Sequence, residues 1–134
     1  MKISIAVVGA HLAGQPLHHQ LADRGAVFVA STTTAPTYRL YALPTIPPKP
    51  GLVRVAPGDP EGAGIEVEVW SLDAGAFASF VDEIPAPLGV GRITLADDTD
   101  VAGFICEPIA LAGPDVVEIT RFGGWRAYLG SPPA

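Results

Sequence analysis

The sequence holds a single cysteine, Cys106, among 134 residues. One cysteine excludes an intramolecular disulfide, so the chain cannot be a small secreted module held together by disulfides. A domain of this length buries roughly two thirds of its unfolded surface and needs no such crosslink. We therefore expect a reducing, cytoplasmic environment, with Cys106 as a buried and unreactive thiol on an apolar strand.

Basic residues and long apolar runs are also scarce. Eight Lys and Arg stand against 14 Asp and Glu, for a formal net charge of −6, and they form no basic stripe that would neutralise phosphates. The apolar run near the N-terminus is interrupted at Gly9-Ala10-His11, too early for a signal peptide or a membrane span. We expect neither a nucleic-acid nor a membrane partner.

Motifs for metals, cofactors and serine nucleophiles are missing as well. The acidic turn at 97–100 lacks the glycine and glutamate of a calcium loop. His18 and His19 are neighbours on a predicted helix, so they point about 100° apart and cannot chelate one ion. The hydroxyl run at 31–34 has no G-x-S-x-G elbow and is interpreted as a strand edge. We expect no metal and no cofactor.

What the chain does contain favours short strands joined by turns. Apolar residues make up 49% of it, together with 15 glycines and 14 prolines. The pattern predicts that the prolines between 44 and 50 prevent regular pairing there. The acidic turn at 96–100 joins two strands as in a β-hairpin. Predicted strands cover residues 3–9, 26–34, 38–43, 52–55, 65–70, 91–95 and 101–106.

Two helices are predicted beside these strands. The first begins at Pro16 and ends at Arg24-Gly25, and the second is capped by Asp73 and ends before Pro85. A short helical turn is predicted at 108–112. Strands outnumber helices and do not alternate with them, so we predict one α+β domain over residues 1–134, built on a small mixed β-barrel or strongly curved sheet.

His11 is the strongest candidate for chemistry. It follows the first apolar strand, between Ala10 and Leu12, in a loop bracketed by Gly9 and Gly14. Glycine-containing loops at strand ends bind small anions and carbonyls, because backbone N–H groups converge there without interference from Cβ atoms. From spacing alone, a structural histidine with satisfied hydrogen bonds explains the position equally well.

Two clusters pair arginine with aromatic residues. They are Tyr38-Arg39-Leu40-Tyr41 and Trp125-Arg126-Ala127-Tyr128. The guanidinium fork suits carboxylates and tyrosine adds a neutral donor, so both clusters fit a small acidic ligand. They fit a homodimer interface as well, because Tyr, Trp and Arg are frequent interface anchors.

Glutamates on the clearest strand form a third candidate group. Glu66 and Glu68 share one face of the alternating segment 65–70, opposite its apolar residues. Either both face solvent or one points into the mouth of the barrel, and the solvated face is the simpler interpretation. Glu66, Glu68 and Glu83 remain alternatives for a carboxylate that faces a pocket.

Six segments in order resemble the C-terminal domain of allophanate hydrolase, and together they cover nearly the whole chain. That family is related to the γ-glutamylcyclotransferase-like fold, a small mixed β-barrel with peripheral helices. The resemblance therefore implies this architecture. The six segments are Val8–Leu17, Tyr38–Leu43, Pro48–Arg54, Ile65–Trp70, Ile84–Gly91 and Phe122–Leu129.

The resemblance also implies a function. In two-domain relatives an amidase domain hydrolyses allophanate, and nothing in this chain resembles it, so we expect no such hydrolysis here. The C-terminal domain has been assigned the next step, decarboxylation of N-carboxycarbamate, in which a histidine is implicated. We place that catalytic role on His11. The implied substrate contacts are Gly9, Ala10, Leu12, Tyr38, Arg39, Tyr41, Glu68, Trp125 and Arg126.

Two other functions stay open beside this enzyme hypothesis. The domain has also been viewed as an assembly module, which here would bind a separately encoded amidase or a small ligand without chemistry. A γ-glutamylcyclotransferase-like reaction on an amino-acyl amide needs a glutamate as general base, yet the corresponding stretch at 84–89 carries proline and apolar residues. The expected partners are thus a small anionic or amide substrate, a second copy of the chain, or an amidase.

Overall fold

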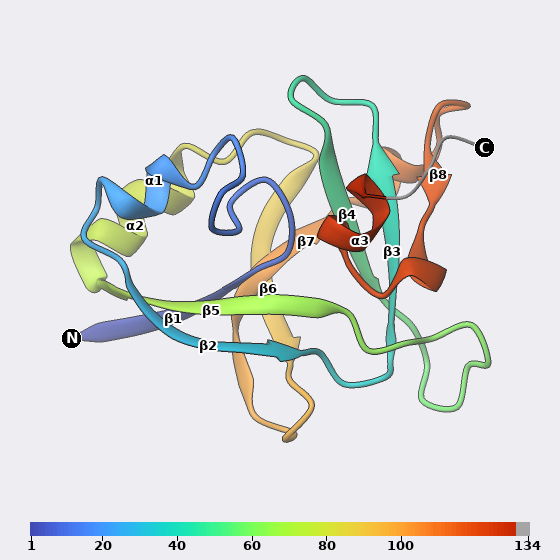
Figure 1. Ribbon diagram of the computed structural model, residues 1–134, viewed down its shortest axis with the longest axis horizontal. Helices are drawn as coiled ribbons and strands as arrows, with labels where there is room; N and C mark the ends of the chain where they lie inside the picture. The colour runs from blue at the N-terminus through green and yellow to red at the C-terminus, as the bar shows by residue number, and fades with distance from the viewer. Residues whose placement is uncertain (131–134) are drawn as a thin grey trace.

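Residues 1–130, which the computed structural model describes, fold into two β-sheets with three short α-helices (Figure 1). Residues 131–134 of the predicted domain lie outside the described part. The strands are β1 (Lys2–Val7), β2 (Val27–Thr33), β3 (Tyr38–Leu43), β4 (Lys49–Arg54), β5 (Glu66–Asp73), β6 (Leu88–Thr94), β7 (Asp100–Cys106) and β8 (Val117–Glu118). The helical segments are α1 (His19–Ala22), α2 (Ala74–Asp82), α3 (Trp125–Leu129) and the 3₁₀ turns η1 (Pro108–Leu111) and η2 (Thr120–Phe122).

The larger sheet has five strands in the order β2-β5-β1-β7-β6. Its central strand β1 runs antiparallel to β5 and parallel to β7, so the sheet is mixed. A central position explains why β1 ends in a continuous apolar run, with Ile5, Ala6 and Val7 fully buried. The predicted hairpin is confirmed, because β6 and β7 pair antiparallel from Leu88–Cys106 to Thr94–Asp100.

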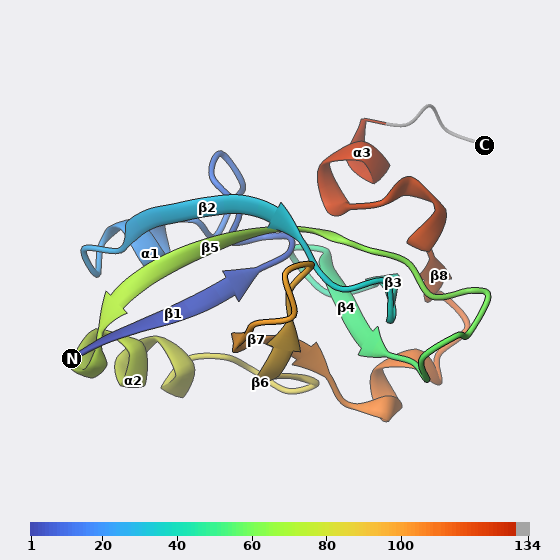
Figure 2. The ribbon, with the colours of Figure 1, turned by 90° about the horizontal axis from the view of Figure 1, so that it is seen from below.

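The smaller sheet has three strands in the order β4-β3-β8. Tyr38 connects it to the larger sheet from the core, where its hydroxyl accepts hydrogen bonds from the Thr94 N–H at 2.9 Å and from Arg54 at 2.7 Å. Figures 1 and 2 show α1 and α2 at the end of the molecule near the N-terminus and α3 at the opposite end, beside the smaller sheet.

The α+β class is confirmed, but the predicted closed barrel is wrong. In residues 1–130 the two sheets stay separate, with β2 and β6 as edges of one and β4 and β8 as edges of the other. Within this range, the two edges of the larger sheet meet only at an isolated bridge between Thr34 and Leu95, the residues that follow β2 and β6, and a second isolated bridge joins Tyr38 of β3 to Ala63 in the connection before β5. No continuous ladder of hydrogen bonds therefore closes the structure, and packing of β4 against β7 takes its place.

Several predicted elements differ in extent. The prediction that Pro50 cannot pair is wrong, because Pro50 lies within β4 opposite Ala42. An edge strand tolerates proline, since only one of its sides needs donors, and β4 is an edge. The first helix is only α1, preceded by turns, and α3 was not predicted. Within the described residues, no helix is long and apolar enough to cross a membrane.

Candidate functional site

The loop after β1 turns back beside β4. The Leu12 N–H donates to the Gly9 carbonyl at 2.9 Å, and the Leu17 N–H donates to the Ala10 carbonyl at 2.8 Å. A Cβ atom on Gly9 would lie 2.2 Å from the ring of Pro50, so only glycine allows this approach. The loop thereby presents His11 to the space between the two sheets.

His11 is 7% exposed and packs between two aromatic rings. Its imidazole stacks on Phe104 with ring centroids 4.8 Å apart, and it meets Phe80 edge-on at 5.2 Å. Its Nε2 lies 2.8 Å from the Gln20 side-chain oxygen. Because an amide oxygen only accepts, Nε2 carries the hydrogen, and Nδ1 is the nitrogen left to take up a proton.

The surroundings keep His11 neutral near pH 7. Burial lowers its pKa from 6.5 to about 4, the bond to Gln20 partly opposes this, and the positive charge of Lys49 lowers it further. A neutral imidazole cannot donate the proton that general acid catalysis needs. A ligand that brings negative charge would raise this pKa, so protonation of His11 and anion binding are coupled.

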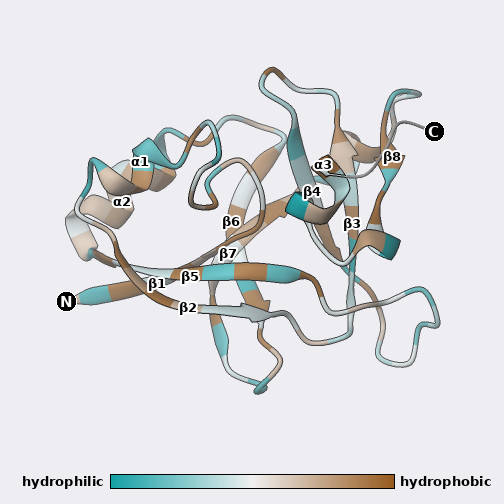
Figure 3. Cartoon of the chain, in the orientation of Figure 1, coloured by the Kyte–Doolittle hydropathy of each residue, from teal (hydrophilic) through white to brown (hydrophobic). Residues whose placement is uncertain are grey.

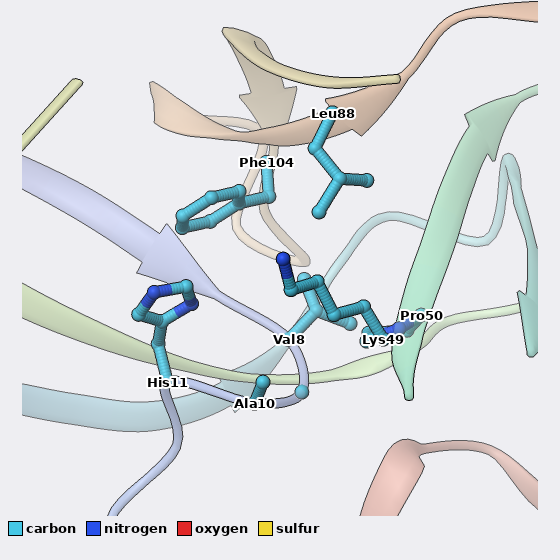
Figure 4. A pocket seen from close by; sticks show the side chains of 8 residues that line it. Val8, Ala10, His11, Lys49, Pro50, Leu88 and Phe104 are labelled. Carbon is cyan, nitrogen blue, oxygen red and sulfur yellow. The ribbon is translucent and has the colours of Figure 1, made fainter. Parts of the chain in front are cut away.

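His11 opens onto a narrow pocket with a cavity volume of about 10 Å³, which is room for about one water molecule. Figure 4 shows the Lys49 side chain running in from β4 and ending between His11, Phe104 and Leu88. The wall is thus mostly apolar, with the backbone at the end of β1 as its floor. The lining residues are Val8, Gly9, Ala10, His11, Lys49, Pro50, Leu88 and Phe104.

Lys49 was missed as a site residue from the sequence. It is only 9% exposed, and among the described residues no hydrogen bond or ion pair engages its ammonium group. In the part of the chain that the structure describes, no buried side-chain nitrogen or oxygen lacks a hydrogen-bond partner, so the Lys49 ammonium group keeps contact with solvent while its aliphatic stem is buried. In the sequence, Lys49 stands between two prolines at the start of a strand, and this pattern does not indicate a pocket.

The predicted carboxylate ligands Arg39 and Arg126 do not line this pocket. Arg39 donates to Glu118 at 2.8 Å and also pairs with Glu61, and its hydrogen bond to Glu118 raises the pKa of Arg39. Arg126 is paired with Glu66 and Glu68. Both guanidinium groups are therefore neutralised by the chain's own carboxylates.

Some of the other predicted site residues line the pocket, and the rest lie outside it. Gly9, Ala10 and His11 line the pocket, whereas Leu12, Tyr38 and Trp125 are buried in the core. Tyr41 is half-buried on β3, and burial raises its pKa. These four side chains, like the two arginines, lie outside the pocket lining.

The three candidate glutamates are also placed elsewhere. Glu68 is 6% exposed, so the expectation that it faces solvent is wrong. That expectation rested on the alternation of hydrophobic and hydrophilic residues along β5, which Figure 3 shows. Burial raises the pKa of Glu68, but bonds from Ala13, Arg126 and Trp70 outweigh this and the net pKa is lowered. Glu66 pairs with Arg126, and Glu83 is exposed and pairs with Arg24. In residues 1–130, no three His, Cys, Asp or Glu side chains converge to hold a metal ion.

Comparison with known families matches residues 3–130 to the allophanate hydrolase C-terminal domain. Urea amidolyase from Saccharomyces cerevisiae is 44% identical over 128 residues, which are 94% of this chain and 7% of that protein. The solved Kluyveromyces lactis allophanate hydrolase is 42% identical at a TM-score of 0.91, over 96% of this chain and 21% of its own. The chain thus spans a small part of these multi-domain relatives.

A solved relative of similar size also exists. A uropathogenic E. coli-specific protein is 33% identical, with a TM-score of 0.86 and 99% of both chains covered. A γ-glutamyl cyclotransferase superposes at a TM-score of 0.56 with 10% identity over 80% of this chain. That distant likeness concerns the fold alone.

Proposed function

The chain belongs to the allophanate hydrolase C-terminal domain family, and from this premise we propose that its His11–Lys49 pocket binds and decarboxylates a small dicarboxylate such as N-carboxycarbamate. The observation that carries the proposal is Lys49: its side chain is largely buried, its ammonium group lacks a counter-ion among the described residues, and it lines a cavity together with His11. An anionic ligand would supply the missing counter-charge.

Binding relies on one strong contact in an apolar setting. A carboxylate beside Lys49 gains a charge-assisted hydrogen bond, which is stronger where Phe104 and Leu88 exclude water. The second carboxylate of the substrate then lies against the apolar wall. The free pocket holds about one water molecule, so the Lys49 side chain moves aside as the substrate enters, and a substrate with few atoms between its two carboxylates is favoured.

The reaction breaks one C–N bond. The carboxylate held against the apolar wall leaves as neutral CO₂, and the bonding electron pair stays on nitrogen. That nitrogen takes one proton, giving carbamate, so a single proton is consumed. An apolar surrounding favours this step, because a charged carboxylate becomes an uncharged product.

His11 is the source of the proton. In the free protein it is neutral, but the negative charge of the substrate raises its pKa, so Nδ1 takes up a proton as the substrate binds. The hydrogen bond from Nε2 to Gln20 keeps the ring oriented throughout. General acid catalysis of this kind contributes roughly two to four orders of magnitude in rate.

The pocket offers less support to the two alternatives. Cyclotransferase chemistry needs a carboxylate base, and among the described residues no Asp or Glu lines the pocket. An assembly module would need Trp125 and Tyr128 on an exposed apolar patch, and Trp125 is 2% exposed. The His11–Lys49 pair is the more specific chemical feature.

Malonate tests the binding site, because it matches N-carboxycarbamate with CH₂ in place of NH. Titration calorimetry on wild type, Lys49→Met and His11→Asn should show binding that Lys49→Met weakens by about 10- to 100-fold. Acetate and biuret, which carry one and no negative charge, serve as ligand controls and should bind far more weakly. Unchanged malonate affinity in Lys49→Met would exclude this pocket as the anion site.

The chemical step is tested with an allophanate-hydrolysing amidase and ¹³C-labelled allophanate. The amidase generates N-carboxycarbamate in solution, and rapid NMR follows its lifetime. Wild-type protein should shorten that lifetime, whereas His11→Asn, folded to the same extent by circular dichroism, should leave the spontaneous rate. Equal lifetimes with both proteins would leave a binding module as the function.

A further inference from the structure

The loop that carries His11 is held at one residue, Ala13, by two side chains from distant elements. The Ala13 N–H donates to Glu68 Oε1 at 2.8 Å, and the Ala13 carbonyl accepts from Arg126 Nη2 at 2.8 Å. The same Arg126 nitrogen lies 2.9 Å from Glu68 Oε2, so the two side chains also hold each other. Ala13 is thus bound through both its donor and its acceptor.

The Glu68 carboxylate is built into this arrangement. It is 6% exposed and accepts a further hydrogen bond from the Trp70 indole at 3.2 Å. Arg126 is steadied by a second ion pair with Glu66 at 3.1 Å. A buried carboxylate with this many donors stays charged and rigid, because loss of any one donor leaves it poorly compensated.

The helix that supplies Arg126 also contacts the other end of the loop. A Cβ atom on Gly9 would lie 3.4 Å from the Trp125 ring, so Trp125 packs against the first turn of the loop. α3 therefore touches the loop on both sides of His11, at Gly9 and at Ala13. Neither Glu68 nor Arg126 lines the pocket, so any effect on the ligand must pass through the loop.

We propose that Glu68 and Arg126 form a positioning clamp, which fixes the backbone on both sides of Ala13 and thereby the orientation of His11 toward Lys49. The effect of the clamp on catalysis rests on the proposed function, whereas its effect on the conformation of the loop does not. His11 and Leu12 are buried, but Ala13 and Gly14 are exposed, and an exposed segment held by local turns alone opens readily. The hydrogen bonds of the clamp connect this segment to β5 and α3 and so oppose its opening.

The test compares two isosteric changes. Glu68→Gln keeps an acceptor for the Ala13 N–H but removes the charge that pairs with Arg126. Glu118→Gln removes the partner of Arg39 in the smaller sheet and is the matched control. Amide hydrogen exchange of residues 10–14 and the affinity for malonate are measured in both variants and in wild type.

We expect Glu68→Gln to speed exchange of residues 10–14 and to weaken malonate binding, each by about tenfold, with core amides of β1 unchanged. Arg126→Met should do the same, and Glu118→Gln should do neither. Should Glu68→Gln prove too unstable, Arg126→Met decides alone. Unchanged loop exchange overturns the clamp, and so does faster exchange with unchanged malonate affinity. If wild type does not bind malonate but Glu68→Gln speeds loop exchange, the proposed function fails while the clamp stands.

Discussion

One pocket of this molecule is lined by both a lysine ammonium group and a neutral imidazole. Lys49 is a cation without a counter-ion among the described residues, and His11 is an imidazole that burial and the nearby lysine keep neutral. Among the described residues no Asp or Glu lines this pocket, so the ligand-free protein supplies it with no negative charge. A dianion stabilises both at once, because it pairs with Lys49 and allows His11 to be protonated.

The pH dependence of stability tests the state of His11. The unfolded chain protonates this histidine near pH 6.5 and the folded protein only near 4, so between these values the unfolded state binds more protons. The contribution of neutral His11 to the free energy of unfolding is complete above pH 6.5, decreases as the pH falls from 6.5 to 4, and is lost below 4. Urea unfolding of wild type should lose on the order of 3 kcal/mol more than His11→Asn between pH 7 and 4. Parallel curves for the two proteins would show that His11 titrates normally.

At the level of elements, the site depends on a close approach between the end of β1 and the start of β4. Gly9 makes it possible, since a Cβ atom there would overlap the ring of Pro50. Pro50 in turn fixes the backbone beside Lys49, so this contact joins the two sheets at the pocket. The elements that carry His11 and Lys49 are thereby held in register.

Gly9→Ala is expected to destabilise the protein by about 1–3 kcal/mol, because Pro50 and the loop must move apart. It should also weaken malonate binding, since His11 and Lys49 separate. Gly89→Ala on β6 is the control: a Cβ there meets no atom within 4 Å, so little change is expected. Thermal unfolding and calorimetry measure both effects. Equal stability of the two variants would contradict the steric argument.

At the level of the whole molecule, one core joins the two sheets. Residues from β1, β3, β4, β5 and β7 pack in a single buried cluster that also includes Trp125 of α3. A shared core predicts one cooperative unfolding transition, because neither sheet buries its apolar face alone.

The two tryptophans report on different parts of that core, Trp70 on β5 and Trp125 on α3. Within each single-tryptophan variant, Trp70→Phe or Trp125→Phe, the fluorescence midpoint in urea should coincide with the far-UV circular dichroism midpoint. An earlier fluorescence transition for the variant that retains Trp125 would show that α3 detaches before the sheets unfold. Because Trp70→Phe also removes the indole donor to Glu68, that result would describe a weakened clamp and not the clamp of the wild-type protein.

Much of the fold was predictable from local pattern. The strands near 38–43 and 65–70, the hairpin at 91–106, the helix after Asp73 and the turn near 108 all follow from apolar spacing and turn residues. The absence of barrel closure and the pairing of Pro50 were not predictable, because both depend on which strands become edges. For the site, the glycine-bracketed loop marked His11, Gly9 and Ala10, all of which line the pocket.

The sequence by itself determined most of the strands, the helix after Asp73, the family and the loop that carries the histidine, because these depend on short-range periodicity and on ordered motifs. Only the tertiary structure decided which charged side chains have an ion-pair partner among the described residues. Arg39 and Arg126 are consumed by glutamates far away in the chain, at separations of 79 and 58 residues, while Lys49 is left facing the pocket. Pairing between distant side chains is set by how the sheets and α3 pack, and no local pattern records it.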